Sequence, residues 1–258
     1  MRILSRLSVA TLAITASLVS LASPSPAQMM EPNSPSSPSS PEPQQSSPPP
    51  PTTTTEITFT DISGNVYKPE ILEAASLKII QGFPDGTFRP KQAVTREQAI
   101  SMIVDALNTV VPIDVNEKPT RRARPYLDIK PDRWSAAKIN WAQWNFSVLQ
   151  AGTYTGNFRP TDPIKRSTLI NFLRSAAENL KLKLGRTSSY LNPTQKPVVF
   201  SDVAGIDKQL TEQMSAYCGI ASPLNEKGNK FAPDQPAARD YTAAAIVRTL
   251  KCVKNDKK

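Results

Sequence analysis

The sequence contains no histidine, and this absence removes several common kinds of active site. A Ser-His-Asp triad needs an imidazole base, and catalytic zinc sites mostly need imidazole ligands. The acidic side chains also form no cluster at metal-ligand spacing. We therefore expect no catalytic residues, no metal site, no cofactor and no enzymatic activity. A glycosidase pair such as Asp61 and Glu70 stays open, but nothing in the sequence marks it.

The sequence has only two cysteines, Cys218 and Cys252. An even number in an exported chain permits a disulfide, and closing a loop of about 35 residues stabilises by roughly 3 to 4 kcal/mol. We expect this bridge to form, the alternative being two free thiols in the core. No cysteine stands directly after the N-terminal apolar run, which argues against a lipoprotein.

Long apolar runs are absent beyond the N-terminus. Residues 1–27 read as a secretory signal, with Arg2 and Arg6 before an apolar stretch at 7–22 and small residues at 25 and 27. The run is short for a membrane span of roughly 20 residues, so a retained anchor is the weaker reading. We expect export to the cell envelope, either the periplasm or the cell surface, and no transmembrane span in the mature chain.

The charge is strongly positive, with 31 Lys and Arg against 22 Asp and Glu. Removal of residues 1–27 leaves 29 against 22, a net charge of +7. A basic chain can bind nucleic acid, anionic lipid or acidic polysaccharide, and export argues against nucleic acid. The densest basic cluster is Arg121, Arg122 and Arg124. Residues 28–55 hold nine Pro, seven Ser and four Thr, a composition typical of an extended or disordered spacer.

From residue 57 onward the chain repeats itself three times. Each repeat opens with an aromatic, any residue and an aspartate, which is Asp61, Asp128 or Asp202. A helical stretch follows, then a glycine-bearing loop that ends in Phe-x-Pro. Eight residues after each of these phenylalanines stands an arginine, which is Arg96, Arg166 or Arg239. The period of about 70 residues makes each unit nearer to a small domain than to a solenoid repeat.

Within a repeat the apolar spacing is helical. In the first repeat, one face carries Ile71, Leu72, Ala75 and Ile79, and a second carries Ala99, Ile103, Leu107 and Val110. Thr95 and Gln98 form a capping box, which predicts a helix start there. Asp85-Gly86 suits a turn that needs a positive φ. Each repeat is therefore predicted to be helix, loop, helix, and the three must pack together to bury a core.

These motifs resemble those of the S-layer homology (SLH) family, and the resemblance covers about residues 57–254. The modules would span 57–111, 124–184 and 198–254. The first repeat keeps most of the family pattern, but it reads Lys78 in place of a glycine and Glu97-Gln98 in place of Ala-Glu. The resemblance implies an all-α fold in which three SLH modules form a pseudo-threefold spindle, each a helix-loop-helix with short extra elements.

The resemblance also implies a function. SLH modules bind peptidoglycan-linked wall polysaccharide, which often carries pyruvylated sugar, in Gram-positive surface-layer proteins and in cyanobacterial outer-envelope proteins. We therefore expect a cell-wall carbohydrate-binding protein. The alternative is a structural protein whose degenerate modules contact another envelope protein, and a wall-acting hydrolase is weaker still.

The predicted ligand-binding residues follow from the motif. A guanidinium matches a carboxylate bidentately, and free N–H groups at a helix start also favour an anion. The alternative is that each arginine pairs with the aspartate of a repeat. Trp134, Trp141 and Trp144 follow helical spacing, so a core role is expected, with Trp144 the expected sugar contact. The predicted set is Asp61, Gly82, Thr95, Arg96, Trp144, Arg166 and Arg239.

Overall fold

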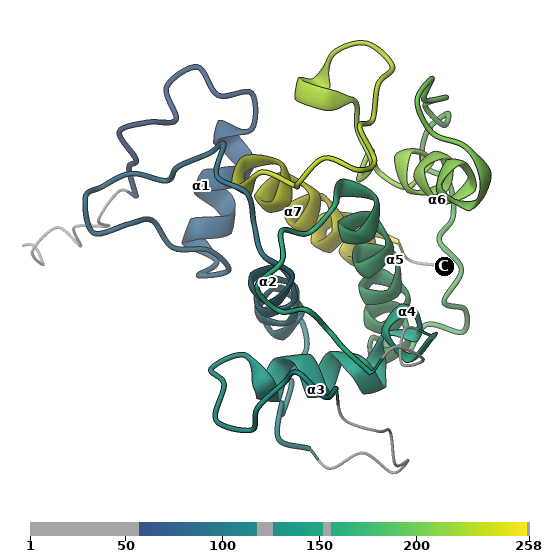
Figure 1. The fold of residues 1–258 in the computed structure, drawn as a ribbon. Helices are drawn as coiled ribbons and strands as arrows, with labels where there is room; N and C mark the ends of the chain where they lie inside the picture. Colours follow the sequence, from purple (N-terminus) through teal and green to yellow (C-terminus); the bar gives the residue numbers. More distant parts are fainter. Residues whose placement is uncertain (1–56, 118–125, 152–155, 257–258) are drawn as a thin grey trace, which may run out of the picture. The chain divides into compact units, whose positions relative to one another are not determined.

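Each repeat folds as an outer helix, a loop and a longer inner helix in the computed structural model (Figure 1). The structure describes residues 57–117, 126–151 and 156–256, all within one compact unit, Thr53–Lys258. The predicted leader, the predicted spacer, the basic cluster at 121, 122 and 124, and Gly152 lie outside the described residues. The described part contains helices and no strand, as expected for an all-α protein. The helices are α1 Lys68–Ser76, α2 Arg96–Asn108, α3 Ala136–Asn145, α4 Ser147–Ala151, α5 Arg166–Lys183, α6 Gly205–Ala216, the short 3₁₀ turn η2 Leu224–Glu226 and α7 Arg239–Asn255.

The local signals of the first repeat are confirmed. Thr95 is the N-cap of α2: its hydroxyl accepts the Gln98 N–H at 3.3 Å, and the Gln98 side chain accepts the Thr95 N–H at 3.0 Å. Gly86 lies in the loop with a φ of 78°. Ile79 is buried but follows the end of α1, so its placement on that helix was wrong.

Helix α1 ends early because Lys78 adopts a φ of 58°, in the left-handed region that terminates helices. This is the position where the family resemblance leads one to expect glycine, and the backbone there keeps the conformation that favours glycine. Cys218, two residues after the end of α6, has a φ of 55° and terminates that helix in the same way.

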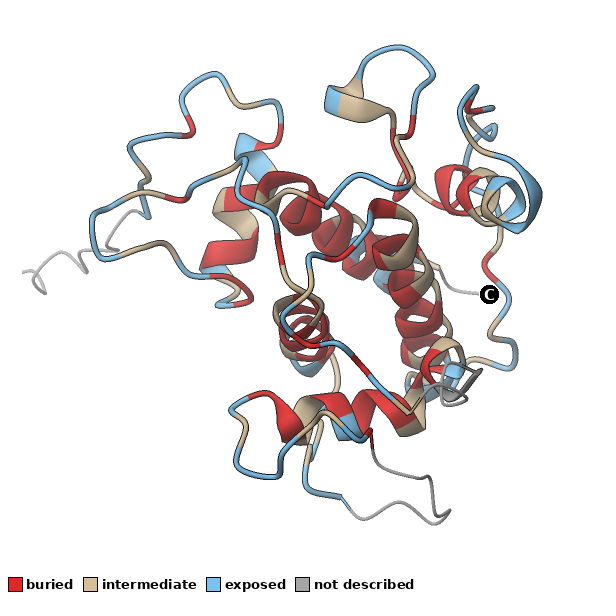
Figure 2. Ribbon diagram, viewed as in Figure 1, coloured by how far each residue is buried: buried red, intermediate tan, exposed pale blue. Residues whose placement is uncertain are grey.

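The inner helices α2, α5 and α7 pack on one another, and the outer helices surround them (Figure 1). Helix α3 packs on α2, α6 packs on α5, and α1 packs on α7. Each outer helix thus leans on the inner helix of the repeat before it, in a cyclic order. The buried residues form one shared cluster, and they are densest along the inner helices (Figure 2). The repeats therefore bury their apolar faces jointly.

Three backbone hydrogen bonds close the cycle at the N-terminal ends of the inner helices. The Val94 N–H donates to the Ala237 oxygen at 2.9 Å, the Ala237 N–H to the Ile164 oxygen at 2.8 Å, and the Ile164 N–H to the Val94 oxygen at 2.9 Å. We call the contact between repeats one and two the first junction, that between two and three the second, and that between three and one the third.

Candidate functional site

Each of the three motif arginines is the first residue of an inner helix, at one of the junctions. The first backbone N–H groups of a helix have no partner within the helix. Here the next repeat supplies it: the Arg96, Arg166 and Arg239 N–H groups donate to loop carbonyls at 2.9 Å, and the following N–H groups donate to Pro160, Pro233 and Pro90. The expectation that these N–H groups could bind an anion is therefore wrong, because they hold the repeats together.

At the first junction, the Arg96 Nε–H donates to the Phe158 carbonyl oxygen at 2.7 Å. Its guanidinium lies over the Phe158 and Phe172 rings, 4.9 and 5.5 Å from their centroids. Burial lowers the pKa of Arg96. The nearby Tyr126 and Asp162 oppose this lowering, and the positive charge of Arg159 adds to it. The residue as a whole is half-buried, so Arg96 keeps some contact with solvent.

At the second junction, Arg166 is 3% exposed and belongs to the core. Its Nε–H donates to the Phe231 oxygen at 2.7 Å and its Nη2–H to the Ser222 oxygen at 2.9 Å. The guanidinium lies 3.6 Å from the centroid of the Tyr241 ring. An arginine so enclosed acts as a strut between repeats.

At the third junction, the Arg239 Nε–H donates to the Phe88 oxygen at 2.9 Å and its Nη2–H to the Gln81 oxygen at 2.8 Å. Its guanidinium lies 4.9 Å from the centroids of the Phe83 and Phe88 rings. Burial lowers the pKa of Arg239, with Arg89 adding to this effect and Asp61 opposing it. The side chain is half-buried, as at the first junction.

The motif aspartates do not pair with these arginines through hydrogen bonds. The Asp61 carboxylate accepts the backbone N–H groups of Phe88 and Arg89, both at 2.7 Å. Asp128 and Asp202 receive the equivalent N–H groups of their own repeats. The alternative of an Arg–Asp pair is therefore wrong. Each aspartate instead folds the loop whose phenylalanine carbonyl receives the arginine.

Gly82 has a packing reason to be glycine. A Cβ at this position would lie 2.3 Å from an edge atom of the Phe59 ring and 3.0 Å from the Thr87 oxygen. The backbone must therefore pass directly against the ring that opens the first repeat. Thr95, the N-cap of α2, likewise has a local structural role.

A cluster around Glu97 was not predicted. Glu97 is the second residue of α2 and is only 6% exposed. Its carboxylate accepts two hydrogen bonds from Arg133 at 2.7 Å each and one from the Ser135 hydroxyl at 2.6 Å. Hydrogen bonding to Arg133 is the main effect that lowers the pKa of Glu97 despite its burial, with smaller contributions from Ser135 and the nearby Trp134 side chain. The sequence feature that could have revealed this cluster is Glu97 itself, which stands where the family pattern has alanine.

The three tryptophans have different environments. Trp141 is buried in the core and stacks edge-on against Phe146, so the core role expected for it is confirmed. Trp134 is 62% exposed and precedes α3, so its assignment to the core was wrong. The reason is that α3 begins only at Ala136, which takes Trp134 off the helical stripe. Trp144, the expected sugar contact, is half-buried near the end of α3.

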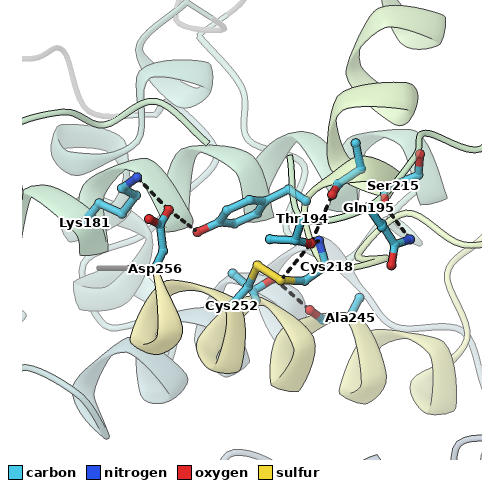
Figure 3. The surroundings of a disulfide bond; sticks show 11 residues. Lys181, Thr194, Gln195, Ser215, Cys218, Ala245, Cys252 and Asp256 are labelled. Atoms are coloured by element: carbon cyan, nitrogen blue, oxygen red, sulfur yellow. Dashed lines mark hydrogen bonds and ion pairs between the residues drawn. A yellow bond between two sulfur atoms is a disulfide. The ribbon is translucent and has the colours of Figure 1, made fainter. Parts of the chain in front are cut away.

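The third repeat is fastened by a disulfide between Cys218 and Cys252, with Cα atoms 5.9 Å apart (Figure 3). Because α6 packs on α5 rather than on α7, this bond is a direct tie between the two helices of the repeat. The Cys218 N–H donates to the Thr194 hydroxyl at 3.0 Å. Nearby, buried Lys181 of α5 pairs with Asp256 at 2.7 Å and so fixes the end of α7.

Among the described residues, no group of three or more Cys, Asp or Glu side chains has a metal-binding arrangement. Within the same residues, none of the helices has the length and apolar character needed to cross a bilayer.

The first repeat matches a known type of module. Residues 58–100, from the opening of the first repeat into α2, match the S-layer homology domain. An SLH domain implies anchoring to wall polysaccharide at the cell surface, so the match points to the cell envelope.

Three relatives extend the comparison. The chain is 28% identical to Exoglucanase XynX of Acetivibrio thermocellus over 202 residues, 76% of this chain and 16% of that protein. It is 28% identical to Amylopullulanase of Thermoanaerobacterium thermosulfurigenes over 197 residues, 75% of this chain and 10% of that protein. It is also 28% identical to Cell surface glycoprotein 1 of Acetivibrio thermocellus over 110 residues, 41% and 4% respectively. The chain thus spans less than a fifth of the length of each.

Proposed function

We propose that the protein is a non-catalytic envelope protein that binds peptidoglycan-linked wall polysaccharide through three SLH modules, at 57–111, 124–184 and 198–254. The modules form a pseudo-threefold spindle around α2, α5 and α7. The observation that carries the proposal is the SLH match at 58–100 combined with the recurrence of the same interlock at all three junctions. The similarity to two relatives also extends over about 200 residues, far beyond the matched segment.

The ligand chemistry follows from the arginines that remain partly open. A half-buried guanidinium in a site of reduced dielectric attracts a carboxylate more strongly than one in bulk water. A pyruvyl ketal on a sugar offers such a carboxylate. Arg96 and Arg239 meet this requirement, whereas Arg166 is enclosed by Tyr241 and contributes to the scaffold. The wall glycan is therefore taken at the first and third junctions.

The absence of catalysis rests on how the carboxylates are used. Glu97 is neutralised by Arg133, and Asp61 is occupied by two backbone N–H groups. Neither is placed as a general acid beside a free carboxylate. The enzyme names of two relatives describe proteins of which this chain matches 16% or less, so their activities are not transferred.

A second candidate is a structural protein whose modules contact another envelope protein. The observation in its favour is that all three arginines already donate to backbone carbonyls within the fold. These guanidinium N–H groups are therefore partly occupied by the protein in the absence of a ligand.

The two candidates separate in a binding experiment with purified wall sacculi. The mature protein should sediment with intact sacculi and stay in solution when the polysaccharide has been stripped from the peptidoglycan. Arg96→Ala should weaken sedimentation, and it should lower the melting temperature less than Arg166→Ala does, because Arg96 donates one side-chain hydrogen bond to a carbonyl and Arg166 donates two. Sedimentation that does not depend on the polysaccharide would favour the protein-contact function.

A further inference from the structure

Trp134 is a large aromatic side chain that the fold leaves in water. It is 62% exposed, although burying an aromatic of this size is among the strongest contributions to stability. Among the described residues, the other large aromatic exposed to this degree is Tyr190, at 60%, in the segment between α5 and α6. The position of Trp134 therefore calls for an explanation other than packing.

The exposed ring is held in place from one edge. Arg133 and Ser135, the residues on either side of Trp134, bind the buried Glu97 carboxylate of another repeat at 2.6 to 2.7 Å. The Trp134 side chain also interacts with this carboxylate, and the indole Nε1–H is its only donor. The backbone on both sides of the ring is thus held to one buried group. A ring ordered before binding loses little entropy when a ligand covers it.

The chemistry of the fixed ring selects the kind of ligand. An indole ring that directs its one N–H toward a protein carboxylate offers a ligand mainly its π face. A flat π face binds the C–H face of a pyranose ring or another apolar surface. Two cations belong to the same junction: Arg133, which is partly exposed, is next to Trp134 in the sequence, and Arg96 directly precedes Glu97 on α2. A stacking face next to a guanidinium suits a sugar ring that carries a carboxylate.

The equivalent positions in the other repeats lack a ring. Val66 directly precedes Tyr67, the N-cap of α1, as Trp134 directly precedes Ser135, the N-cap of α3. Val66 is 52% exposed, so the fold leaves this place open to solvent in the first repeat as well. In the third repeat, Val203 directly precedes Ala204, the N-cap of α6, and it is half-buried. Of these three positions, Trp134 alone carries a ring, and the motif arginine of its junction is half-buried.

We propose that Trp134 is a sugar-stacking platform that binds a pyranose ring of the wall glycan at the first junction, with the carboxylate of that glycan directed toward Arg96. Glu97 is the positioning residue that holds the platform. This inference rests on the proposed function. It distinguishes the first junction, where the residue before the outer helix is Trp134, from the third, where that residue is Val66.

The test measures sacculus binding and indole NMR signals of the full mature protein. Trp134→Ala should weaken sacculus binding about three- to tenfold, and Trp134→Phe, which keeps a ring, should weaken it less. Val66→Ala and Tyr190→Ala are the matched controls, one at the equivalent position and one removing an equally exposed ring, and both should bind as the wild type does. Titration with a methyl hexopyranoside bearing a 4,6-pyruvyl ketal should shift the Trp134 indole signal. The same sugar without the ketal should shift it less.

The outcomes separate the platform from the proposed function. Full sacculus binding by Trp134→Ala, together with weakened binding by Arg96→Ala, would overturn the platform and leave the glycan function standing. Failure of the wild type to bind sacculi would overturn both. Normal sacculus binding by Trp134→Ala with lost capture of a purified envelope protein would show that the ring serves a protein partner. Glu97→Gln should reduce the heteronuclear NOE of the Trp134 indole N–H at an unchanged fold, and an unchanged value would remove its positioning role.

Discussion

Replacing Arg166 by alanine should destabilise the whole folded unit, although arginine is usually a surface residue. The substitution removes a cation that is 3% exposed and donates to the carbonyl oxygens of Phe231 and Ser222. A hydrogen bond to a charged group contributes about 1.5 to 3 kcal/mol, and each buried carbonyl left unpaired adds a desolvation cost. The loss of two such bonds gives a change in unfolding free energy of at least about 3 kcal/mol.

This magnitude can be measured by thermal unfolding of the mature protein. For a unit of about 200 residues, each kcal/mol shifts the melting temperature by roughly 2 to 4 °C, so Arg166→Ala should lower it by at least about 6 °C. Arg174→Ala is the matched control on the same helix. Arg174 forms a half-exposed pair with Glu178 four residues on, and such pairs are worth only about 0.3 to 0.5 kcal/mol.

The result that would refute this reasoning is a melting temperature within about 2 °C of the Arg174→Ala control. If sacculus binding were lost at the same time, Arg166 would be a ligand contact rather than a strut. The distinction drawn between the enclosed second junction and the two half-open ones would then be wrong.

Four further predictions concern single sites. Arg96→Ala should reduce the affinity for wall polysaccharide about 10- to 150-fold, and Arg96→Lys should also weaken it, because a point charge cannot replace the guanidinium fork; equilibrium binding to sacculi measures both. Lys78→Gly should raise the melting temperature by about 2 to 4 °C, because glycine relieves roughly 1 kcal/mol of left-handed backbone strain; no change would mean that Lys78 gains an offsetting contact. Cys252→Ser should lower the unfolding free energy by about 3 kcal/mol, measured by urea titration against the wild type under oxidising conditions. Below about pH 4.5 the wild type should lose unfolding free energy faster than Glu97→Gln. The pKa of Glu97 in the folded state lies below the ordinary 4.5, so the ionised carboxylate stabilises the fold above that pH, and this stabilisation is lost as the pH falls through the lowered pKa. Parallel curves of unfolding free energy against pH for the two proteins would contradict this.

The local parts of the fold could be predicted because their chemistry is local. A capping box joins residues three apart, and a positive-φ turn depends on its own glycine, so Thr95 and Gly86 were recognisable in the sequence. The threefold recurrence was visible because the loops keep their aromatic, proline and arginine at fixed spacing. The end of α1 at Lys78 was not predictable, since nothing in the lysine indicates a left-handed backbone.

The partners of the arginines could not be predicted, because they are backbone carbonyls. Every residue has a carbonyl group, so no side chain marks Phe158, Phe231 or Phe88 as acceptors. Helical spacing also misplaced Trp134, because periodicity does not fix where a helix begins. The departure at Glu97 was the one sequence feature that pointed to the cluster at the first junction.

The three junctions show how a closed cycle tolerates differences between its repeats. At the third junction, Asp240 is the second residue of α7, as Glu97 is of α2, and its buried carboxylate accepts hydrogen bonds from Asn65 and Lys91 at 3.0 and 2.9 Å. Each of these two carboxylates binds a residue just before an outer helix of the next repeat.

At the second junction, the second residue of α5 is Ser167, which has no carboxylate. At this junction the buried Arg166 side chain connects the two repeats through hydrogen bonds to the Phe231 and Ser222 carbonyl oxygens. The arginines of the other two junctions also donate to loop carbonyls, Arg96 to Phe158 and Arg239 to Phe88 and Gln81. There the carboxylate of Glu97 or Asp240 adds a second set of hydrogen bonds between the repeats. The two junctions with this added carboxylate are the ones whose arginine stays half-buried, whereas Arg166 is enclosed.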